Sequence, residues 1–168
     1  MELFRPPTLD QDENWMRLAL DLARGAGLRG EVPVGCVIVV DGVLVGQGFN
    51  QREALQDPSA HAEILALRQA AAAVGFWRLD GATAYVTLEP CPMCAGALVN
   101  ARVARLVFGA RDPKAGYCGS LHDTVQDQRL NHRLVVTEGV LQEACGAVLS
   151  DFFRDLRARR ATPRPDQP

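Results

Sequence analysis

Residues 87–96 read TLEPCPMCAG, and residues 61–63 read HAE. The longer stretch places a Cys-x-x-Cys pair where an apolar strand pattern gives way to a helix pattern. Together, His61, Cys91 and Cys94 supply one imidazole and two thiolates, which are three of the four ligands that a tetrahedral zinc ion takes. The glutamate of the HAE triplet is close enough in sequence to reach a water in the fourth position. The two stretches therefore indicate a catalytic zinc centre.

His61 and Glu63 can share a site only at the first turn of a helix. In the middle of a helix, residues i and i+2 point in divergent directions. The pair Cys91 and Cys94 also follows a strand and opens a helix, whose positive N-terminal end favours thiolates. We therefore expect the zinc ion between two helix N-termini, with Glu63 as the residue that moves protons.

Two other interpretations of the motif remain open. A Cys-x-x-Cys pair after a strand is also typical of thioredoxin-like redox proteins, although a redox pair gives no reason for the upstream histidine and glutamate. A structural zinc site would need a fourth protein ligand. The other cysteines and histidines are its candidates: Cys36, Cys118, Cys145, His122 and His132. The apolar patterns around Cys36 and Cys145 favour core positions, whereas Cys118 and His122 lie in an expected loop.

The composition suits a globular protein without a strongly charged surface. The chain has 168 residues, 48% of them hydrophobic, and a formal net charge of -2. We expect one domain over residues 1–160, and RNA binding would need a local basic patch. The five cysteines cannot all pair, the N-terminus lacks a signal-peptide pattern, and no apolar run is long enough to span a bilayer. We therefore expect a cytoplasmic protein with reduced thiols and no membrane association.

Hydrophobic periodicity predicts an α/β fold. The first expected helix carries an apolar stripe from Trp15 to Ala26 and ends near Gly25 to Gly30. The other expected helices cover residues 60–74, 90–101 and 141–160, and the expected strands cover residues 34–40, 43–49, 83–88, 103–108 and 134–137. The alternation of strands and helices after residue 43 indicates at least partly parallel pairing. We expect a central sheet layered with helices.

Some local details of this arrangement are also predicted. Ser59 is the expected N-cap of the second helix. The expected inward face of that helix consists of Ile64, Leu67, Ala71 and Val74. The proline-containing tail over residues 161–168 is expected to be disordered.

Further segments surround the zinc motif: PVG at residues 33–35, FGARD at 108–112, NHR at 131–133 and SDFF at 150–153. With the HAE and TLEPCPMCAG segments, they resemble the bacterial tRNA-specific adenosine deaminases. The likeness runs from about Trp15 to Arg160. The zinc motif alone marks only the wider cytidine deaminase-like superfamily, and the flanking segments narrow the match.

The resemblance implies a cytidine deaminase-like fold, with three α/β/α layers around a mixed five-stranded sheet. It implies hydrolytic deamination of adenosine to inosine at the wobble position of a tRNA anticodon, with an arginine tRNA as the expected substrate. It also implies one Zn²⁺ per subunit held by His61, Cys91 and Cys94, with Glu63 as the catalytic proton shuttle. The implied partners are the tRNA anticodon loop and a second copy of the chain.

The resemblance also assigns substrate contacts near the metal. Asn50 matches an asparagine that contacts the target nucleotide, although by itself it is typical of a turn. Val34 matches an apolar wall of the base pocket, and the backbone at Ala62 would orient the base. Asp112 and Lys114 match an RNA-contacting loop.

Phe153 is a further expected substrate contact. It lies off the apolar stripe of the last helix, where an exposed ring can stack on a splayed base. Peripheral core packing is the alternative. The arginines that follow it form a candidate phosphate-binding patch: Arg154, Arg157, Arg159 and Arg160.

Two other functions compete with this hypothesis. A small-molecule deaminase acting on cytidine, a deoxycytidylate or guanine shares the zinc and the glutamate, but it does not need the loop at residues 112–120 or an aromatic and basic terminal helix. A zinc-stapled RNA-binding module without catalysis would not need Glu63.

Overall fold

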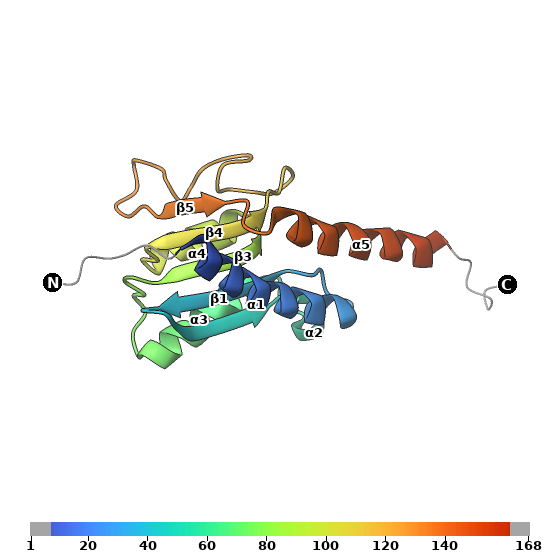
Figure 1. The fold of residues 1–168 in the computed structure, drawn as a ribbon, viewed down its shortest axis with the longest axis horizontal. Coiled ribbons are helices and arrows are strands. Elements are labelled where there is room, and N and C mark those ends of the chain that lie inside the picture. The colour runs from blue at the N-terminus through green and yellow to red at the C-terminus, as the bar shows by residue number, and fades with distance from the viewer. Residues whose placement is uncertain (1–7, 162–168) are drawn as a thin grey trace.

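The computed structural model describes residues 8–161. The N-terminal residues 1–7 and most of the tail expected to be disordered, residues 162–168, lie outside the described residues; Ala161 is instead the last residue of a helix. Five strands form one mixed sheet in the order β2 (Val43–Phe49), β1 (Gly35–Val40), β3 (Thr83–Leu88), β4 (Arg105–Ala110) and β5 (Val135–Glu138) (Figure 1). Strand β1 is antiparallel to β2 and β3, whereas β3, β4 and β5 are parallel. This confirms the expected mixed five-stranded sheet.

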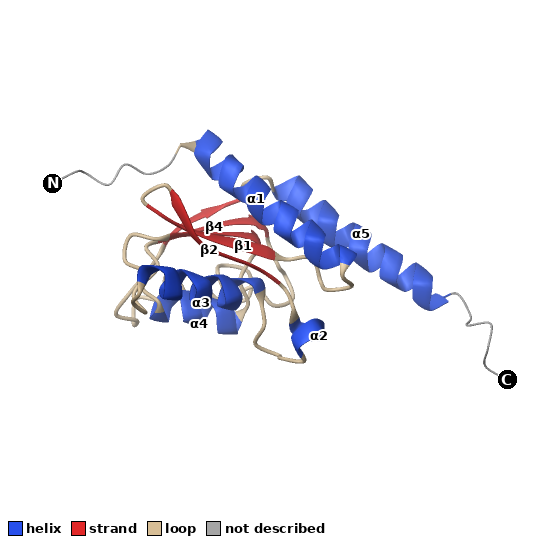
Figure 2. Cartoon of the chain, turned by 90° about the horizontal axis from the view of Figure 1, so that it is seen from below, coloured by secondary structure: helices blue, strands red, loops and turns tan. Residues whose placement is uncertain are grey.

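Helices cover both faces of this sheet. The helices α1 (Leu9–Leu28) and α5 (Gln142–Ala161) lie on one face, and α3 (Ala62–Val74) and α4 (Pro92–Asn100) lie on the other (Figure 2). A short helix that the sequence did not predict, α2 (Arg52–Leu55), follows β2. The expected three-layer α/β/α arrangement is confirmed. Within residues 8–161, no helix is both long and apolar enough to cross a membrane.

The strands β1, β3 and β4 are buried on both faces and divide their side chains between two cores. Ile38, Val86 and Leu106 belong to the core beneath α3 and α4. Their neighbours on the strands, such as Val37 and Val107, pack against α1 and α5. Successive residues of a strand point to opposite faces, so each of these three strands contributes to both cores.

Two helix predictions need correction. Helix α1 starts at Leu9, well before Trp15, because Thr8 and Gln11 form a capping box. Helix α3 is capped by His61 and not by Ser59, whose amide and hydroxyl instead donate to the Asp57 carboxylate at 2.8 and 2.7 Å.

The inward face of α3 also differs from the prediction. Leu67 is buried as expected, but Val74 is 46% exposed, and the face against the sheet consists mainly of Ala62, Ala66 and Ala70. The cause lies in β2, where a side chain at Gly46 or Gly48 would collide with the α3 backbone. Glycines in the strand let the alanine face of α3 approach the sheet closely, and this fixes the start of α3 beside the end of β2.

A buried ion pair joins α1 to the sheet. Arg105 donates to the two carboxylate oxygens of Asp12 at 2.8 and 2.7 Å, and Tyr85 donates its hydroxyl to the same carboxylate at 3.0 Å. Arg105 also donates to the Thr137 hydroxyl at 2.9 Å. Asp12 and Arg105 are only 3% and 7% exposed. The cluster therefore connects α1 with β3, β4 and β5 in a region with little solvent.

Replacing Asp12 by alanine should strongly destabilise the fold. The change leaves the Arg105 guanidinium buried without its counter-charge, which costs about 3–5 kcal/mol in the free energy of unfolding. The half-exposed pair between Glu13 and Arg17, one residue away, offers a matched control, since Glu13→Ala should cost at most about 1 kcal/mol. Urea denaturation of the two variants measures both values. Equal losses would contradict a stabilising role for the buried pair.

Candidate metal centre and nucleotide pocket

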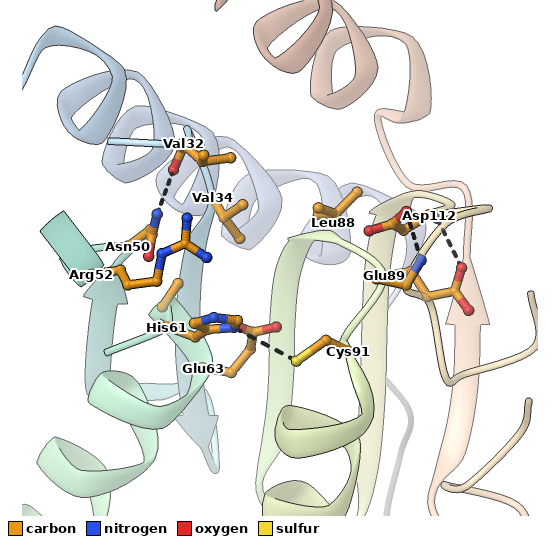
Figure 3. A pocket seen from close by; sticks show the side chains of 12 residues that line it. Val32, Val34, Asn50, Arg52, His61, Glu63, Leu88, Glu89, Cys91 and Asp112 are labelled. Carbon is orange, nitrogen blue, oxygen red and sulfur yellow. Dashed lines mark hydrogen bonds between the residues drawn. The ribbon is translucent and has the colours of Figure 1, made fainter. Parts of the chain in front are cut away.

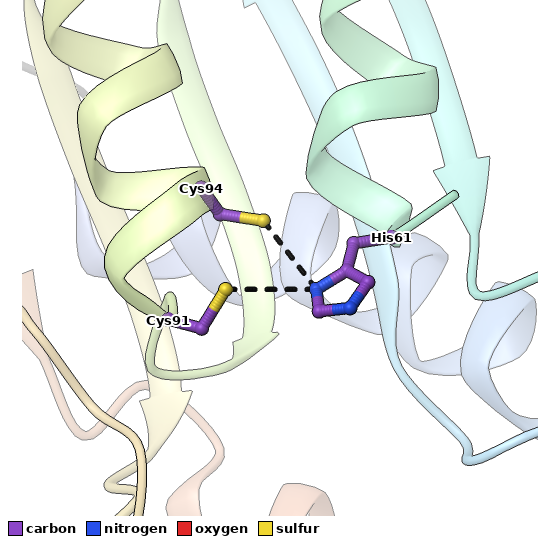
Figure 4. A group of neighbouring side chains, drawn as sticks. All are labelled: His61, Cys91 and Cys94. Carbon is purple, nitrogen blue, oxygen red and sulfur yellow. Dashed lines mark hydrogen bonds between the residues drawn. The ribbon is translucent and has the colours of Figure 1, made fainter. Parts of the chain in front are cut away.

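The three predicted metal ligands lie together in the structure. The Nδ1 atom of His61 is 3.6 Å from the sulfur of Cys91 and 3.6 Å from the sulfur of Cys94 (Figure 4). The three ligand atoms all lie within 4.8 Å of one another. Zinc–sulfur bonds of ~2.3 Å and zinc–nitrogen bonds of ~2.0–2.1 Å, meeting at a tetrahedral angle, would place nitrogen and sulfur about 3.6 Å apart. The donor set and its spacing therefore fit a tetrahedral metal ion.

Two helix N-termini position these ligands. His61 is the N-cap of α3 and Cys91 is the N-cap of α4, and both have extended backbone. An N-cap residue lies just outside the helix, so its side chain can point past the helix end. Cys94 lies in the first turn of α4. The metal group therefore lies between the two helices, as expected from the sequence.

The two cysteines share a proton unequally. A hydrogen bond from Cys94 lowers the pKa of Cys91 to about 4. The same hydrogen bond raises the pKa of Cys94, and burial raises it further. Cys91 is therefore a thiolate at neutral pH, and a divalent cation would replace the proton that Cys94 holds.

Glu63 lies in the first turn of α3, beside this group. It is only 4% exposed, and this burial raises its pKa to about 7. The Cys94 thiol forms a hydrogen bond with its carboxylate. Figure 3 shows the carboxylate next to the His61 ring, at the edge of a pocket. A buried carboxyl group thus lies where the fourth metal position would open.

The candidates for a fourth protein ligand lie elsewhere. Cys36 and Cys145 are buried in the two cores, as expected. His132 bonds to the Val103 carbonyl oxygen at 2.7 Å, and His122 lies against the Tyr117 ring. Cys118 lies in the expected loop, but its side chain is buried in the core beneath α3 and α4. Among residues 8–161, the group of His61, Cys91 and Cys94 is the only one of its kind.

A pocket opens next to the metal group. Its volume is about 160 Å³, close to the ~150 Å³ cavity that holds one benzene ring in another protein. The pocket is therefore suited to a single base, with the rest of a nucleotide outside. Its lining includes the metal group and residues from both helix starts: Val32, Val34, Asn50, Arg52, His61, Ala62, Glu63, Leu88, Glu89, Cys91, Asp112 and Ala115.

Four of the six expected substrate contacts line this pocket: Val34, Asn50, Ala62 and Asp112. Asn50 is 7% exposed, and its side-chain amide donates to the Val32 carbonyl at 3.3 Å, which fixes its orientation (Figure 3). Asp112 accepts from the backbone amides of Lys114 and Ala115 at 2.9 and 3.1 Å and so closes a tight turn.

The other two expected contacts lie outside the pocket lining. The Lys114 side chain is exposed on the turn that Asp112 closes. Phe153 is 39% exposed on α5 and meets Phe152 edge-on, with 5.4 Å between the ring centroids. Phe152 is half-buried, so the division of the two rings between core and surface agrees with the sequence pattern.

Two polar residues that line the pocket, Arg52 and Glu89, were not predicted from the sequence. Arg52, on α2, extends toward His61 (Figure 3). Its helix is held by the buried carboxylate of Glu31, which accepts from the amides of Glu53 and Ala54 at 3.2 and 2.7 Å. Glu89 is 2% exposed at the end of β3. A charged residue directly after an apolar strand was the available signal for Glu89, whereas nothing in the sequence pattern singles out Arg52.

Comparisons with known proteins agree with this geometry. Residues 10–157 match the family model of the MafB19-like deaminases. The tRNA-specific adenosine deaminase of Bacillus subtilis is 50% identical over 156 residues, covering 93% of this chain and 97% of the relative. The protein of the same name from Haemophilus influenzae is 49% identical over 150 residues, covering 89% and 87%.

Solved structures show the same likeness. One comes from a study of A-to-I editing by tRNA:A34 deaminases at the wobble position; it is 43% identical, with a TM-score of 0.78, and covers 81% of this chain and 99% of that chain. A guanine deaminase from Nitrosomonas europaea is 25% identical, with a TM-score of 0.73, covering 90% and 95%. The identity to the named relatives and the length of the match show that the chain belongs to the family of tRNA-specific adenosine deaminases.

Proposed function

We propose that this protein is a zinc-dependent hydrolase that converts adenosine to inosine at the wobble position of a tRNA anticodon and releases ammonia. The observation that carries the proposal is the buried carboxylate of Glu63 beside the group of His61, Cys91 and Cys94, at the edge of a pocket for one base. The names of the related proteins support the choice of substrate.

One Zn²⁺ per subunit would be held by His61, Cys91 and Cys94, and it would supply a water that is acidic enough to attack at neutral pH. Glu63 takes a proton from the attacking water and passes it to a nitrogen of the adenine ring. The water oxygen bonds to C6. Glu63 then moves the remaining proton of this oxygen to the amino nitrogen, the bond between C6 and that nitrogen breaks, and ammonia leaves a carbonyl at C6. Burial of Glu63 keeps bulk water away from this proton transfer.

The pocket lining would hold the base in place. Val34 offers an apolar wall, and the backbone at Ala62 lies beside it. Asn50, fixed by its bond to Val32, would contact the target nucleotide. Asp112 would line the other side of the pocket, and Lys114 would reach the RNA backbone from the same turn. Because the pocket suits one base, the target base has to leave the stack of the anticodon loop.

A second candidate function is the deamination of free guanine, which the similarity to the guanine deaminase structure favours. Incubation of the purified protein with free nucleosides and bases, and separately with an arginine tRNA that carries an anticodon adenosine, separates the two. The proposal expects inosine at the first anticodon position of the tRNA. Turnover of free guanine or cytidine with the tRNA unchanged would reject it.

Phe153→Ala should weaken tRNA binding without changing the metal content. If the ring stacks on a base, its removal costs about 1–3 kcal/mol, so the Kd for tRNA should rise about fivefold or more. Val43→Ala is the control, because Val43 is 61% exposed at the start of β2, at the opposite end of that strand from Asn50. Fluorescence anisotropy with labelled tRNA measures both variants, and equal Kd values for Phe153→Ala and the wild type would contradict stacking.

The basic residues of α5 support the same binding surface. Arg157, Arg159 and Arg160 are exposed near the end of the helix, whereas Arg154 pairs with Asp151 at 2.8 Å. We propose that the exposed arginines contact phosphates of the tRNA, because the chain as a whole carries no positive net charge to attract it.

We also propose a cytoplasmic homodimer. A reducing compartment such as the cytoplasm keeps thiols free to bind zinc. Large apolar side chains are exposed on α3 and α4 and in the loop after α3, and such surfaces mark contacts between proteins: Val74, Phe76, Trp77 and Met93. Light scattering of the purified protein measures the mass, and a monomeric mass would reject the dimer.

A further inference from the structure

Glu89 lies between the metal centre and a long loop. It follows the last residue of β3 and precedes the metal-binding Cys91 by two positions. Its side chain is 2% exposed, and it has no basic partner among its hydrogen-bonding contacts. All of these contacts come instead from residues 112–120, which we call the 112–120 loop.

The carboxylate of Glu89 receives four hydrogen bonds from this loop. One oxygen accepts from the backbone amides of Cys118 and Ser120, at 3.0 and 2.9 Å. The other oxygen accepts from the backbone amide of Asp112 at 2.9 Å (Figure 3) and from the hydroxyl of Ser120. One side chain therefore binds the loop at its first residue, at its last residue and at Cys118.

The loop is shaped to fit around this carboxylate. A side chain at Gly116 would collide with the carboxyl group of Glu89, so glycine lets the backbone pass directly over it. The amide of Tyr117 also donates to the carbonyl of Pro90 at 2.9 Å. The loop contains no helix or long strand. Its backbone amides therefore donate to Glu89 and Pro90 in place of the backbone hydrogen bonds that order a helix or a sheet.

The same loop forms part of the nucleotide pocket. Asp112 and Ala115 line the pocket on the side opposite Asn50, and Lys114 lies between them in the sequence (Figure 3). The position of this wall therefore depends on the contacts that hold the loop, and the strongest set of these contacts belongs to Glu89. Hydrogen bonds to an ionised acceptor are stronger than those between neutral groups.

We propose that Glu89 is a positioning residue that holds the 112–120 loop in its substrate-binding arrangement before the substrate arrives. The relation of the loop to tRNA rests on the proposed function, whereas the attachment of the loop does not. A carboxylate suits this role because both oxygens only accept. In Glu89→Gln, the amide nitrogen would face two donors, and part of the loop would detach.

The sequence supplies a direct probe of this attachment. Lys114 is the only lysine of the chain, and it is exposed within the loop. A lysine-specific endoprotease therefore cuts the native chain at one position, after Lys114. When opening is faster than cleavage, the cutting rate follows the fraction of molecules in which the loop is open.

Glu89→Gln should raise the rate of cleavage after Lys114 about tenfold or more, the scale expected when buried donors lose a charged acceptor. Glu31→Gln is the matched control, because Glu31 is also 2% exposed and also accepts from backbone amides, but it holds α2. That control should be cut at the wild-type rate. A folded Glu89→Gln protein that is cut at the wild-type rate would overturn the proposal.

Gly116→Ala tests the same contact from the loop side, should Glu89→Gln fail to fold. The added methyl group pushes the loop away from the carboxylate, so cleavage should again accelerate about tenfold. A wild-type rate in this variant would also overturn the proposal. Intact mass measurement identifies the two expected fragments, residues 1–114 and 115–168.

Kinetics with tRNA give a separate readout. A displaced pocket wall should raise the KM of Glu89→Gln more than it lowers kcat, whereas a general loss of folded enzyme lowers kcat alone. A fall in kcat with KM unchanged would contradict the positioning role. If the wild-type protein makes no inosine, the proposed function fails, while the cleavage experiment still decides whether Glu89 holds the loop.

Discussion

Glu63→Ala should nearly abolish inosine formation while the protein keeps its fold and its metal. Residues that transfer protons in the transition state contribute about 10²–10⁴-fold to the rate, so kcat should fall by at least about 100-fold. The metal should stay because its ligands are His61, Cys91 and Cys94, none of which is changed. Single-turnover assays with saturating tRNA measure the chemical step, and elemental analysis measures zinc per chain.

Glu63→Gln provides the matched control. It keeps the size of the side chain, so the packing around a residue that is 4% exposed is disturbed less than in Glu63→Ala. It still cannot take a proton from water, and we expect a loss of activity of the same order. Wild-type turnover in either variant would reject Glu63 as the proton shuttle. The alternative of a zinc-stapled module, in which this carboxylate has no chemical role, instead predicts that neither the wild-type protein nor the variants form inosine.

The metal centre was predictable from the sequence because local spacing determines it. An N-cap histidine before one helix and a Cys-x-x-Cys pair at the start of another place their side chains past the helix ends whatever the rest of the fold does. The mixed sheet was predictable for a similar reason. The buried strands β1, β3 and β4 read as short apolar runs, separated by the helices and the hairpin that fix their order.

The packing of α3 was not predictable from its own residues. An alanine-rich helix shows apolar character on several faces, and the larger Ile64 and Val74 suggested the wrong one. The deciding information lies in Gly46 and Gly48 of β2, which admit only the small alanine side chains. Glycines at alternate positions of a strand were the available signal for close helix contact.

The composition of the pocket was also not predictable from local sequence alone. Val34 and Asp112 come from segments that are far apart in the sequence, and the fold brings them to one cavity. Arg52 lies on a four-residue helix whose first amides are bound by the distant Glu31. No local sequence pattern therefore predicts this helix or the position of Arg52. Tertiary contacts of this kind position a residue without producing any hydrophobic periodicity in the sequence.

His61→Ala should remove the metal itself and, with it, all deamination. Loss of outer-shell partners alone typically lowers metal affinity about 10–100-fold, so loss of a direct ligand should lower zinc affinity at least about 100-fold. The remaining thiols, Cys91 and Cys94, then share a proton instead of a cation. The thermal midpoint should also fall, because a bound metal stabilises the folded state in proportion to its affinity. Elemental analysis and thermal melts with and without added zinc measure these effects.

His122→Ala is the matched control, and it also tests whether the metal site is closed. His122 is 49% exposed, lies against Tyr117 and does not belong to the metal group, so its removal should leave one zinc per chain. Zinc loss in this variant would identify a fourth protein ligand, and a site with four protein ligands has no position for the attacking water. A full zinc content in His61→Ala would instead reject the ligand assignment. The two histidine variants together therefore test the ligand assignment of His61 and exclude or identify His122 as a fourth ligand, independently of any assay for inosine.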